Sequence, residues 1–375
     1  MNNSKKIYLG YNSIKNLSKV LYDLKAKEIF LVCGKNSFTK SGAESVINSL
    51  QSKFNFSRFS DFSPNPKIED VQKGCDLFNK KKFDVILSIG GGSSIDISKL
   101  IKGLSGTIEE KVNSVIANKS DPKNIPLITV PTTLGSGSES THFAVVYVDK
   151  KKYSLSHNLL LPNYVILDPS LSLSNSRYNK ASAGMDALCQ AIESLWSVNS
   201  TSESRSYSKE AIILLREYLV ESVNSPNKLN TLKVAEASNL AGRAINIAKT
   251  TAPHALSYLF AEKLGISHGH AVSLTMPYFI RYNSAYETHE TKLLLEKESL
   301  KMHMQTLYNC FGVNSSLDCS KKFISICNDL KLQNVLHKIK SKEMLKNLVD
   351  NLNIERAKNN PVLIDKEHLI FSIYE

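Results

Sequence analysis

The chain has 375 residues, with 47 Lys and Arg against 35 Asp and Glu, which gives a formal charge of +12 at pH 7. A composition of 42% hydrophobic and 22% charged residues excludes a disordered or fibrous chain, and the length predicts two domains. The positive charge could indicate nucleic acid, an anionic membrane or a small anionic substrate. The lysines form short scattered clusters without zinc-finger spacing or an aromatic ribonucleoprotein motif, which favours a solvated surface and argues against nucleic-acid binding.

The cysteines and the amino terminus bear on the cellular compartment. The six cysteines are scattered without a CxxC pair, which argues against a disulfide framework and against a cysteine-built metal site. The first residues, MNNSKKIYLGYNS, lack the apolar core of a signal peptide, and no run of about 18 apolar residues predicts a membrane-spanning helix. We therefore expect a cytoplasmic protein with reduced thiols and no membrane partner.

The first part of the chain alternates short apolar runs with helix-like segments. The runs predict buried strands because they are rich in β-branched residues and are bounded by glycine or proline. They are Ile29–Val32, Val85–Ile89, Leu127–Val130, Phe143–Val148 and Val165–Leu167. This alternation predicts a doubly wound α/β domain over residues 1–170, with a mostly parallel sheet that binds ligands at the carboxyl ends of its strands.

Beyond Asp168-Pro169 the pattern changes to apolar residues at spacings of three and four. This spacing predicts an all-helical domain over residues 171–375. Ser208–Val220, Thr231–Ala248 and Leu293–Tyr308 have ordinary amphipathic patterns that indicate packing alone. Since no low-complexity linker separates the halves, we expect a ligand-binding cleft between them.

Two loops that follow predicted strands contain glycines and hydroxyl side chains. GGGSSID, at residues 90–96, lies between a strand and a helix, where glycines let the backbone approach a diphosphate and helix amides can bind it. PTTLGSGSE, at residues 131–139, can hydrogen-bond ribose and phosphate oxygens. Either loop alone could be an ordinary turn, but together they predict a nucleotide site.

A possible metal site lies in the helical half. Asp186 and Gln190 are four residues apart and share a helix face. His254 follows Pro253 near an expected helix start, Gly265 suits the end of that helix, and His268 comes shortly after. One carboxylate and two imidazoles suit Zn²⁺ or Fe²⁺ with an open coordination position, although each residue alone could be an ordinary polar side chain.

The motifs GGGSSID, PTTLGSGSE and GMDALCQAIES and the spacing from His254 to His268 resemble, in this order, the iron-containing (group III) alcohol dehydrogenases. These proteins are relatives of glycerol dehydrogenase and dehydroquinate synthase. The resemblance runs from Tyr8-Leu9-Gly10 to Asn360-Pro361. It implies the two-domain architecture of dehydroquinate synthase and the iron-containing alcohol dehydrogenases, an NAD(P)-dependent oxidoreductase, one divalent metal and, as a default, a homodimer.

The resemblance also implies roles for individual residues. The cofactor diphosphate and ribose would be held by Gly91, Gly92, Ser93 and Asp96. The nucleotide site would be lined by Thr132, Thr133 and Ser136, and Lys152 would approach the nicotinamide ribose. The metal ligands would be Asp186, His254 and His268, with Gln190 as a fourth ligand or a neighbour that orients another.

Three positions depart from the family pattern. Gln190 replaces a histidine ligand, so Zn²⁺ and Mn²⁺ become as plausible as Fe²⁺. Tyr258 replaces a histidine that is common in members acting on alcohols, which argues against an ordinary short-chain alcohol as substrate. Gly34 stands where NAD-preferring relatives often carry an acidic residue. Gly34 would not repel a 2′-phosphate, and Lys35 could contact one, so we expect NADPH to be accepted alongside NADH; a plain solvated Lys35 is the alternative.

Several segments resemble the phosphonoacetaldehyde reductase branch of this family, namely residues 183–197, 245–255, 268–272 and 359–362. This resemblance implies reduction of phosphonoacetaldehyde to 2-hydroxyethylphosphonate. Asn246, Lys249 and Thr250, with Tyr258, would contact a small anionic aldehyde, although Lys249 could instead be a surface residue. The alkoxide formed by hydride transfer would take a proton from water or from His270, whose alternative role is to orient a ligand.

Other activities stay open at this point. Members of the same family could act on general alcohols, polyols, lactaldehyde, butanol or sulfoacetaldehyde. A cyclase similar to dehydroquinate synthase would retain its NAD⁺ through the cycle, whereas a reductase consumes NAD(P)H. A noncatalytic nucleic-acid binder would show salt-sensitive binding without metal or cofactor.

Overall fold

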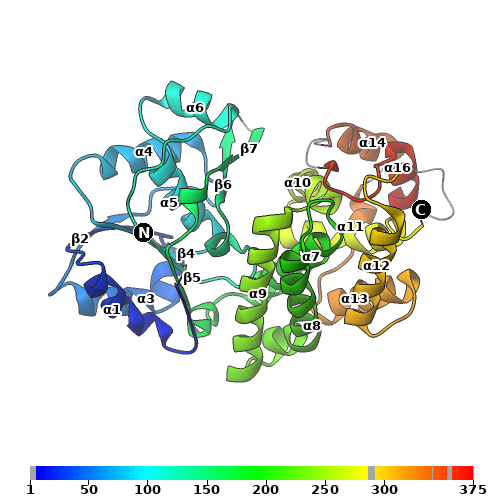
Figure 1. Ribbon diagram of the computed structural model, residues 1–375, viewed down its shortest axis with the longest axis horizontal. Coiled ribbons are helices and arrows are strands. Elements are labelled where there is room, and N and C mark those ends of the chain that lie inside the picture. The colour runs from blue at the N-terminus through cyan, green and yellow to red at the C-terminus, as the bar shows by residue number, and fades with distance from the viewer. Residues whose placement is uncertain (1–5, 150, 286–291, 340, 353–356, 375) are drawn as a thin grey trace. The chain divides into compact units, whose positions relative to one another are not determined.

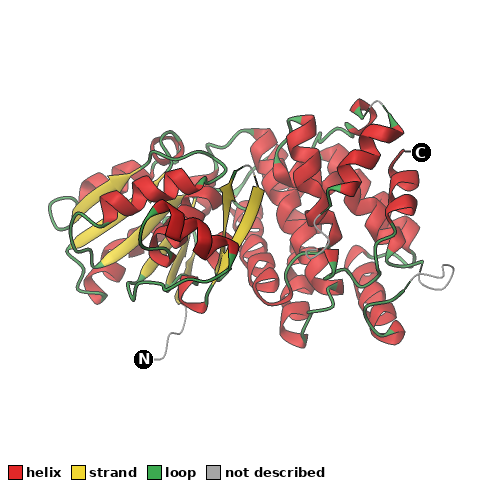
Figure 2. Ribbon diagram, turned by 90° about the horizontal axis from the view of Figure 1, so that it is seen from above, coloured by secondary structure: helices red, strands yellow, loops and turns green. Residues whose placement is uncertain are grey.

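The chain folds into two units, and the structure, a computed structural model, describes residues 6–149, 151–285, 292–339, 341–352 and 357–374. Unit 1 spans Met1–Asn175 and unit 2 spans Ser176–Glu375. All strands among the described residues belong to unit 1 (Figure 1 and Figure 2). The predicted fold class, an α/β domain followed by a helical one, is confirmed.

Unit 1 is built on a parallel six-stranded sheet with the order β1-β8-β5-β4-β2-β3. Its strands are β1 (Lys6–Leu9), β2 (Glu28–Cys33), β3 (Asn55–Phe59), β4 (Val85–Gly90), β5 (Leu127–Pro131) and β8 (Tyr164–Leu167). The central strands β4 and β5 are buried along their whole length, as expected for a parallel sheet covered on both faces. The sequence predicted β2, β4, β5 and β8, but it did not predict the more exposed edge strands β1 and β3.

Alternate residues of each strand enter two separate hydrophobic cores. On one face Leu31 and Leu87 pack with α1 and α3, and on the other Phe30 and Ile86 pack with α4, α5 and α6. Figure 1 shows these two helix layers on opposite sides of the sheet. The helices of unit 1 are α1 (Asn16–Asp23), α2 (Ser37–Lys40), α3 (Ala43–Leu50), α4 (Ile68–Phe78), α5 (Gly92–Gly103) and α6 (Ile108–Ile116).

The run Phe143–Val148 forms a strand, β6, but this strand does not join the parallel sheet. It pairs antiparallel with β7 (Lys151–Ser156) in a two-stranded sheet, with Val148 opposite Lys151. A connection this short between two strands permits only antiparallel pairing. The prediction of a parallel strand here was therefore wrong.

The described residues of unit 2 form helices and no strand, apart from an isolated β-bridge between Leu293 and Val362. The helix α7 is buried almost continuously from Ala181 to Trp196 and packs against α8, α9 and α11. The helices are α7 (Arg177–Trp196), α8 (Ser202–Asn224), α9 (Lys228–Ala248), α10 (Ala252–Leu264), α11 (His268–Tyr282), α12 (Lys297–Phe311), α13 (Ser316–Asp329), α14 (Lys342–Asp350) and α16 (Lys366–Tyr374).

The ends of α10 follow from its sequence. Pro253 lies in the first turn, where its missing N–H costs no intrahelical hydrogen bond, and Gly265 ends the helix with φ of 64°. The next helix, α11, begins at His268. His254 therefore lies at the start of one helix, as the sequence predicted, and His268 lies at the start of the next.

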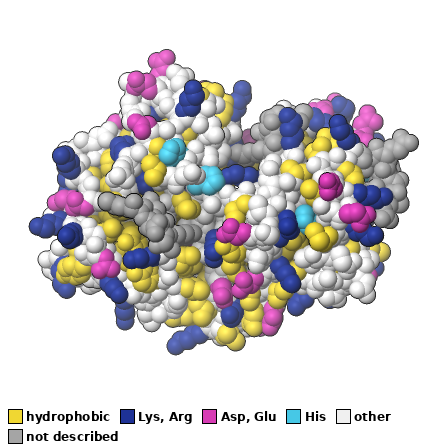
Figure 3. Space-filling view, in the orientation of Figure 1, with side chains coloured by type: hydrophobic (Ala, Val, Ile, Leu, Met, Phe, Trp, Pro, Cys, Tyr) yellow, Lys and Arg dark blue, Asp and Glu magenta, His cyan; other side chains and the backbone are white. Residues whose placement is uncertain are grey.

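The surface is consistent with an ordinary solvated protein. On the face drawn in Figure 3, Lys and Arg side chains are interspersed with Asp, Glu and apolar side chains. Within the residues that the structure describes, no helix combines the length and apolar character that crossing a bilayer requires.

Candidate functional site

The two glycine-containing loops of unit 1 meet at the carboxyl edge of the sheet. Gly90 at the end of β4 is paired with Pro131 at the end of β5, and the amide of Thr132 donates to the carbonyl of Gly90 over 2.9 Å. A Cβ atom added at Gly91 would lie 3.3 Å from Thr133 Oγ1, and one at Gly92 would lie 3.0 Å from Ser136. The predicted nucleotide residues of the two loops are therefore brought together, and they are packed too closely for larger side chains at the glycines.

The start of α5 presents the backbone donors that a diphosphate needs. Gly91 is the N-cap of this helix, no acidic residue lies in the first turn, and the amides there carry the positive end of the helix dipole. The Ser93 hydroxyl donates a hydrogen bond to the carbonyl of Pro64. At the end of β2, a Cβ at Gly34 would lie 2.3 Å from Ser37 Oγ, so this third strand end is equally compact.

Asp96 and Lys99 fasten the second loop to α5. The Asp96 carboxylate accepts hydrogen bonds from Ser138 Oγ at 2.5 Å and from the amide of Val145 at 3.2 Å. Burial raises the pKa of Asp96, while the charges of Lys99 and Lys152 oppose that rise. The ammonium of Lys99, which is fully buried, donates to the Ser138 carbonyl at 2.6 Å. The sequence analysis missed Lys99, although its position three residues after Asp96 places it on the same helix face.

Lys35 lies on the surface near the end of β2. Its ammonium is 3.1 Å from Asp61 Oδ1, and Lys73 contacts the other oxygen of the same carboxylate at 3.0 Å. The Arg58 guanidinium lies 3.5 Å from the backbone carbonyl of Lys35. Lys35 and Lys73 thus share the exposed carboxylate of Asp61, whereas Arg58 is paired with Glu44 at 3.4 Å.

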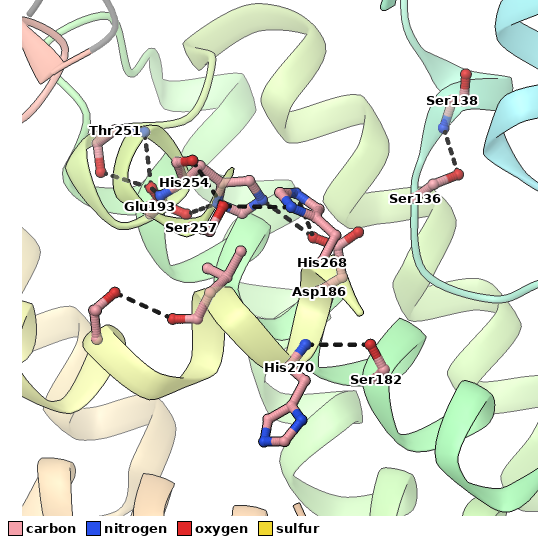
Figure 4. Close-up of polar contacts among 12 residues, drawn as sticks. Ser136, Ser138, Ser182, Asp186, Glu193, Thr251, His254, Ser257, His268 and His270 are labelled. Carbon is pink, nitrogen blue, oxygen red and sulfur yellow. Dashed lines mark hydrogen bonds and ion pairs between the residues drawn. The ribbon is translucent and has the colours of Figure 1, made fainter. Parts of the chain in front are cut away.

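In unit 2, Asp186, His254 and His268 form the predicted group of metal-ligating side chains, with one ligand atom from each within 4.8 Å of the others. The Nε2 atom of His254 lies 3.1 Å from Asp186 Oδ1, and the Nε2 atom of His268 lies 3.9 Å from the same oxygen. Figure 4 shows the three side chains converging. This donor set of one carboxylate and two imidazoles suits Fe²⁺, Zn²⁺ or Mn²⁺ and leaves a coordination position for substrate.

Asp186 is held as a carboxylate despite its burial. Burial by itself raises its pKa, but hydrogen bonds from the side chains of His254 and Gln190 and the charge of His268 outweigh that effect, and the pKa falls below its usual value. Gln190 is buried one turn further along α7. It therefore contacts the ligand group through Asp186, as the sequence analysis allowed.

His254 is held from its other side by Glu193, which the sequence analysis missed. The Nδ1 atom of His254 is hydrogen-bonded to Glu193 Oε2, a fully buried carboxylate. Burial lowers the pKa of His254, but the charge of Glu193 and hydrogen bonds to both carboxylates raise it to about 9. A divalent metal would take the place of the proton on Nε2, so metal binding below this pH releases a proton. The seven-residue spacing from Asp186 to Glu193 was the available signal, since it returns to the same helix face.

His268 is oriented by two neighbours on α10. Its Nδ1 atom lies 3.3 Å from Ser257 Oγ, and the Ser257 hydroxyl itself donates to the carbonyl of His254 at 2.8 Å. The hydroxyl therefore accepts from Nδ1, which leaves the Nε2 lone pair of His268 facing Asp186. The ring of Tyr258, a predicted substrate residue, stacks on His268 at a centroid distance of 4.8 Å.

The structure does not bring His270 into this group. One ring nitrogen, Nδ1, is 3.2 Å from the Tyr178 hydroxyl, and the other, Nε2, is 2.9 Å from the carbonyl of Gln333. Figure 4 shows its ring pointing away from Asp186. Because both nitrogens are engaged elsewhere, the geometry gives no support to the predicted proton transfer by His270.

The predicted substrate residues Asn246, Lys249 and Thr250 lie at the end of α9 and in the turn that leads to His254. Lys249 has φ of 63° and ψ of 176°, a region that residues other than glycine rarely occupy. Burial lowers the pKa of its ammonium to about 8, which leaves it mainly protonated at pH 7. A strained, cationic residue therefore lies in the turn before the candidate metal ligand His254.

Comparison with known proteins agrees with this arrangement. The family model of iron-containing alcohol dehydrogenase matches residues 4–169, and the model of the carboxy-terminal domain of the Fe-containing alcohol dehydrogenase family matches residues 180–375. The chain belongs to the iron-containing alcohol dehydrogenase family. It is thus an oxidoreductase of the class that acts on alcohols and aldehydes.

Members of this family with diverse substrates resemble the chain. Long-chain-alcohol dehydrogenase 1 of Geobacillus thermodenitrificans is 29% identical over 314 residues, which cover 82% of this chain and 76% of that protein. Phosphonoacetaldehyde reductase of Streptomyces viridochromogenes is 33% identical over 214 residues, which cover 54% of each protein. The crystal structure of sulfoacetaldehyde reductase from Bifidobacterium kashiwanohense in complex with NAD⁺ has a TM-score of 0.86 and 27% identity, and the match covers 99% of this chain and 96% of that one.

Proposed function

We propose that this iron-containing alcohol dehydrogenase family member reduces a small anionic aldehyde, and that the substrate is phosphonoacetaldehyde, which gives 2-hydroxyethylphosphonate. The aldehyde carbon gains a hydride from NAD(P)H and its oxygen gains a proton. The observation that carries the proposal is the placement of Lys249, a cation in a strained turn that leads directly to the metal ligand His254. The 33% sequence identity with a phosphonoacetaldehyde reductase and the structural match with a sulfoacetaldehyde reductase support the same substrate class.

Asp186, His254 and His268 would hold the divalent metal, since they alone among the described His, Cys, Asp and Glu residues form such a group. When bound, the metal polarises an aldehyde oxygen as a Lewis acid, and NAD(P)H supplies the hydride. The hydrogen bond from Gln190 adds to the larger effects of His254 and His268, which together lower the pKa of Asp186 and keep it ionised. In this proposal His270 has no catalytic role, and the proton comes from water.

The anionic end of the substrate would meet Lys249, with Asn246 and Thr250 from the same segment and Tyr258 beside the metal. An ammonium can form a charge-assisted hydrogen bond with a phosphonate oxygen, and partial burial strengthens such a bond. A neutral aldehyde such as butyraldehyde would gain nothing from this contact. The turn therefore favours anionic over neutral substrates.

The cofactor would bind in unit 1. The diphosphate would lie at Gly91, Gly92 and Ser93, at the start of α5, and Thr132, Thr133 and Ser136 would line the site. Lys152 interacts electrostatically with Asp96, and we assign it to the nicotinamide ribose. Since Gly34 carries no carboxylate and Lys35 and Arg58 are close by, we expect NADPH to be accepted as well as NADH.

The experiment is a substrate panel with the purified, metal-loaded enzyme. Phosphonoacetaldehyde, sulfoacetaldehyde, lactaldehyde and butyraldehyde are each compared by NADH and by NADPH consumption. We expect the highest kcat/KM with phosphonoacetaldehyde. A higher value with sulfoacetaldehyde would identify the second candidate, which the fold match favours, and equal rates with butyraldehyde would contradict an anionic substrate.

A homodimer in the cytoplasm completes the proposal. The six cysteines are all free thiols in the structure, which suits a reducing compartment. Sedimentation of the purified protein tests the oligomeric state.

A further inference from the structure

The two oxygens of Glu193 contact different parts of the site. Oε2 is hydrogen-bonded to Nδ1 of His254. Oε1 accepts three hydrogen bonds, from the amide of Thr251 at 2.8 Å, from the hydroxyl of Thr251 at 3.0 Å and from the amide of His254 at 3.2 Å. Figure 4 shows Glu193 between Thr251 and His254. The carboxylate is fully buried, and these four donors balance its charge.

Glu193 also takes the place of a side-chain cap on α10. The N-cap residue of this helix, Thr251, does not cap it with its own side chain. The amides of Thr251 and His254 would be unsatisfied in the interior without the carboxylate from α7. Trp196, on the same helix as Glu193, donates its indole N–H to the Thr251 hydroxyl at 3.0 Å and fixes the direction in which that hydroxyl donates.

The strained turn at Lys249 is held by the same helix. Ser197, which follows α7, donates to the carbonyl of Ala248 at 2.7 Å, and Glu193 binds the amide of Thr251. The carbonyl of Thr250 accepts a hydrogen bond of 3.1 Å from the side chain of Asn359. Hydrogen bonds thus fix both sides of Lys249, which is what a rare backbone conformation needs in order to persist.

From these contacts we infer that Glu193 is a positioning residue that couples the metal ligand His254 to the substrate-binding turn at Lys249. One carboxylate sets the tautomer of His254, with the proton on Nδ1 and the lone pair of Nε2 toward the metal, and anchors the turn through Thr251. The assignment of the turn to substrate rests on the proposed function. The contact with His254 does not depend on which aldehyde is reduced.

The variant Glu193→Gln tests the coupling because an amide cannot satisfy both sets of contacts. If its oxygen keeps the three donors of Thr251 and His254, its NH₂ group faces Nδ1 and forces the proton of the imidazole onto Nε2, the atom that should bind the metal. If the amide is turned over, the three donors meet an NH₂ group and the turn is released. We expect both orientations of the amide to be populated, so the substitution disturbs the metal ligand and the turn with little change in volume.

Two measurements on the full-length protein report the state of His254 and the state of the turn at Lys249, and neither relies on turnover. Competition of Zn²⁺ against a chelator gives metal affinity, which we expect to fall 10- to 100-fold in Glu193→Gln. Hydrogen exchange of the segment 249–254 reports the turn, and we expect its protection to fall at least fivefold. Zinc affinity within twofold of the wild type together with unchanged exchange would overturn the inference.

Thr251→Val tests the anchoring of the turn separately from the contact with His254. It also provides a test if Glu193→Gln does not fold. It removes the hydroxyl contact to Glu193 and leaves the bond to His254 Nδ1, so we expect faster exchange in 249–254 with zinc affinity within threefold of the wild type. Thr251→Ser should restore protection, since it restores the hydroxyl. Unchanged exchange in Thr251→Val would overturn the proposed anchoring of the turn.

A matched control replaces a buried carboxylate of unit 1. Asp70 accepts hydrogen bonds from the amide and the hydroxyl of Ser63 at 3.0 and 2.7 Å, with no contact to the metal ligands. Asp70→Asn should leave zinc affinity and the exchange of 249–254 unchanged. Loss of zinc binding in this control would show that general destabilisation explains the result and would overturn the inference, whereas absence of aldehyde reduction in the wild type would contradict only the proposed function.

Discussion

The phenol ring of Tyr258 lies parallel to the imidazole ring of His268, with centroids 4.8 Å apart and an interplanar angle of 6°. His268 is the most exposed of the three candidate metal ligands, with 36% of its side chain accessible. The stack covers one face of the imidazole and limits its rotation. Tyr258 therefore supports the metal ligand in addition to any contact with the substrate.

Tyr258→Ala is expected to weaken metal binding without abolishing it. An aromatic pair contributes about 0.5–1.5 kcal/mol beyond its buried area, so zinc affinity should fall about 3- to 10-fold. Tyr258→Phe keeps the ring and should keep the affinity. Chelator competition measures both variants, and equal affinities of Tyr258→Ala and the wild type would show that the stack does not support the ligand.

The candidate ligand set predicts one result for Asp186, His254 and His268 and a different result for Gln190. Asp186→Ala, His254→Ala and His268→Ala should each lose metal and activity, whereas Gln190→His should retain metal and change the preference among Fe²⁺, Zn²⁺ and Mn²⁺ or among substrates. Metal content by mass spectrometry and turnover with each added metal check this. Full metal content and full turnover in His268→Ala would contradict the site.

The site could be predicted from sequence only as far as local patterns extend. The GGGSSID and PTTLGSGSE loops follow buried strands, and the pairing of Gly90 with Pro131 brings them together. Asp186, His254 and His268 were found because the helix start at Pro253 and the helix end at Gly265 are visible in the sequence and because the family spacing matches. Glu193 was missed because the seven-residue spacing from Asp186 shows only that both residues share a face of α7, whereas the contact of Glu193 with His254 depends on how α7 packs against α10.

The errors in the fold have a similar origin. β3 and β7 contain polar residues and are partly exposed, so they lack the apolar runs by which the other strands were recognised. β6 was recognised but assigned to the wrong sheet, because a run of apolar residues does not show which neighbour pairs with it. The site prediction for His270 had a similar origin: its closeness in sequence to His268 suggested it as an alternative to water in proton transfer, but residues two apart in a helix point in different directions.

Lys249→Gly is expected to stabilise the protein and at the same time impair binding of the anionic substrate. Glycine adopts a φ of 63° without the strain that a lysine suffers, so the free energy of unfolding should rise by about 1 kcal/mol. Loss of the ammonium removes a charged hydrogen bond, so the KM for phosphonoacetaldehyde should rise at least tenfold. Lys249→Met should raise KM equally without the gain in stability, and a KM for butyraldehyde that rose as much would contradict a role in binding the anion.

The protonation state of Lys249 also predicts how binding depends on pH and salt. Because burial lowers its pKa to about 8, the ammonium is present below pH 8 and is lost as the pH rises above it. The KM for phosphonoacetaldehyde should therefore increase from pH 7 to pH 9, and also with added salt, while the KM for butyraldehyde changes little. Steady-state kinetics of the wild type and Lys249→Met separate this residue from other titrating groups, since the variant should lack the dependence attributed to Lys249.

His303 lies on α12, away from the candidate metal ligands. It should make the fold sensitive to acid. Burial and the charge of Arg205 lower its pKa to about 4, and its buried Nδ1 atom has no hydrogen-bond partner within the part of the chain that the structure describes. In the unfolded chain a histidine has a pKa of about 6.5. Between pH 6.5 and pH 4, His303 is therefore protonated in the unfolded chain and neutral in the folded one. This contribution to stability is therefore fully present above pH 6.5 and decreases as the pH falls toward 4, by on the order of 3 kcal/mol. His303→Leu should lose this part of the pH dependence in denaturant unfolding of the metal-free protein, whereas His337→Leu, at an exposed position, should follow the wild type. If the curves of His303→Leu and the wild type stayed parallel from pH 7 to pH 4, the acid sensitivity would have to arise elsewhere.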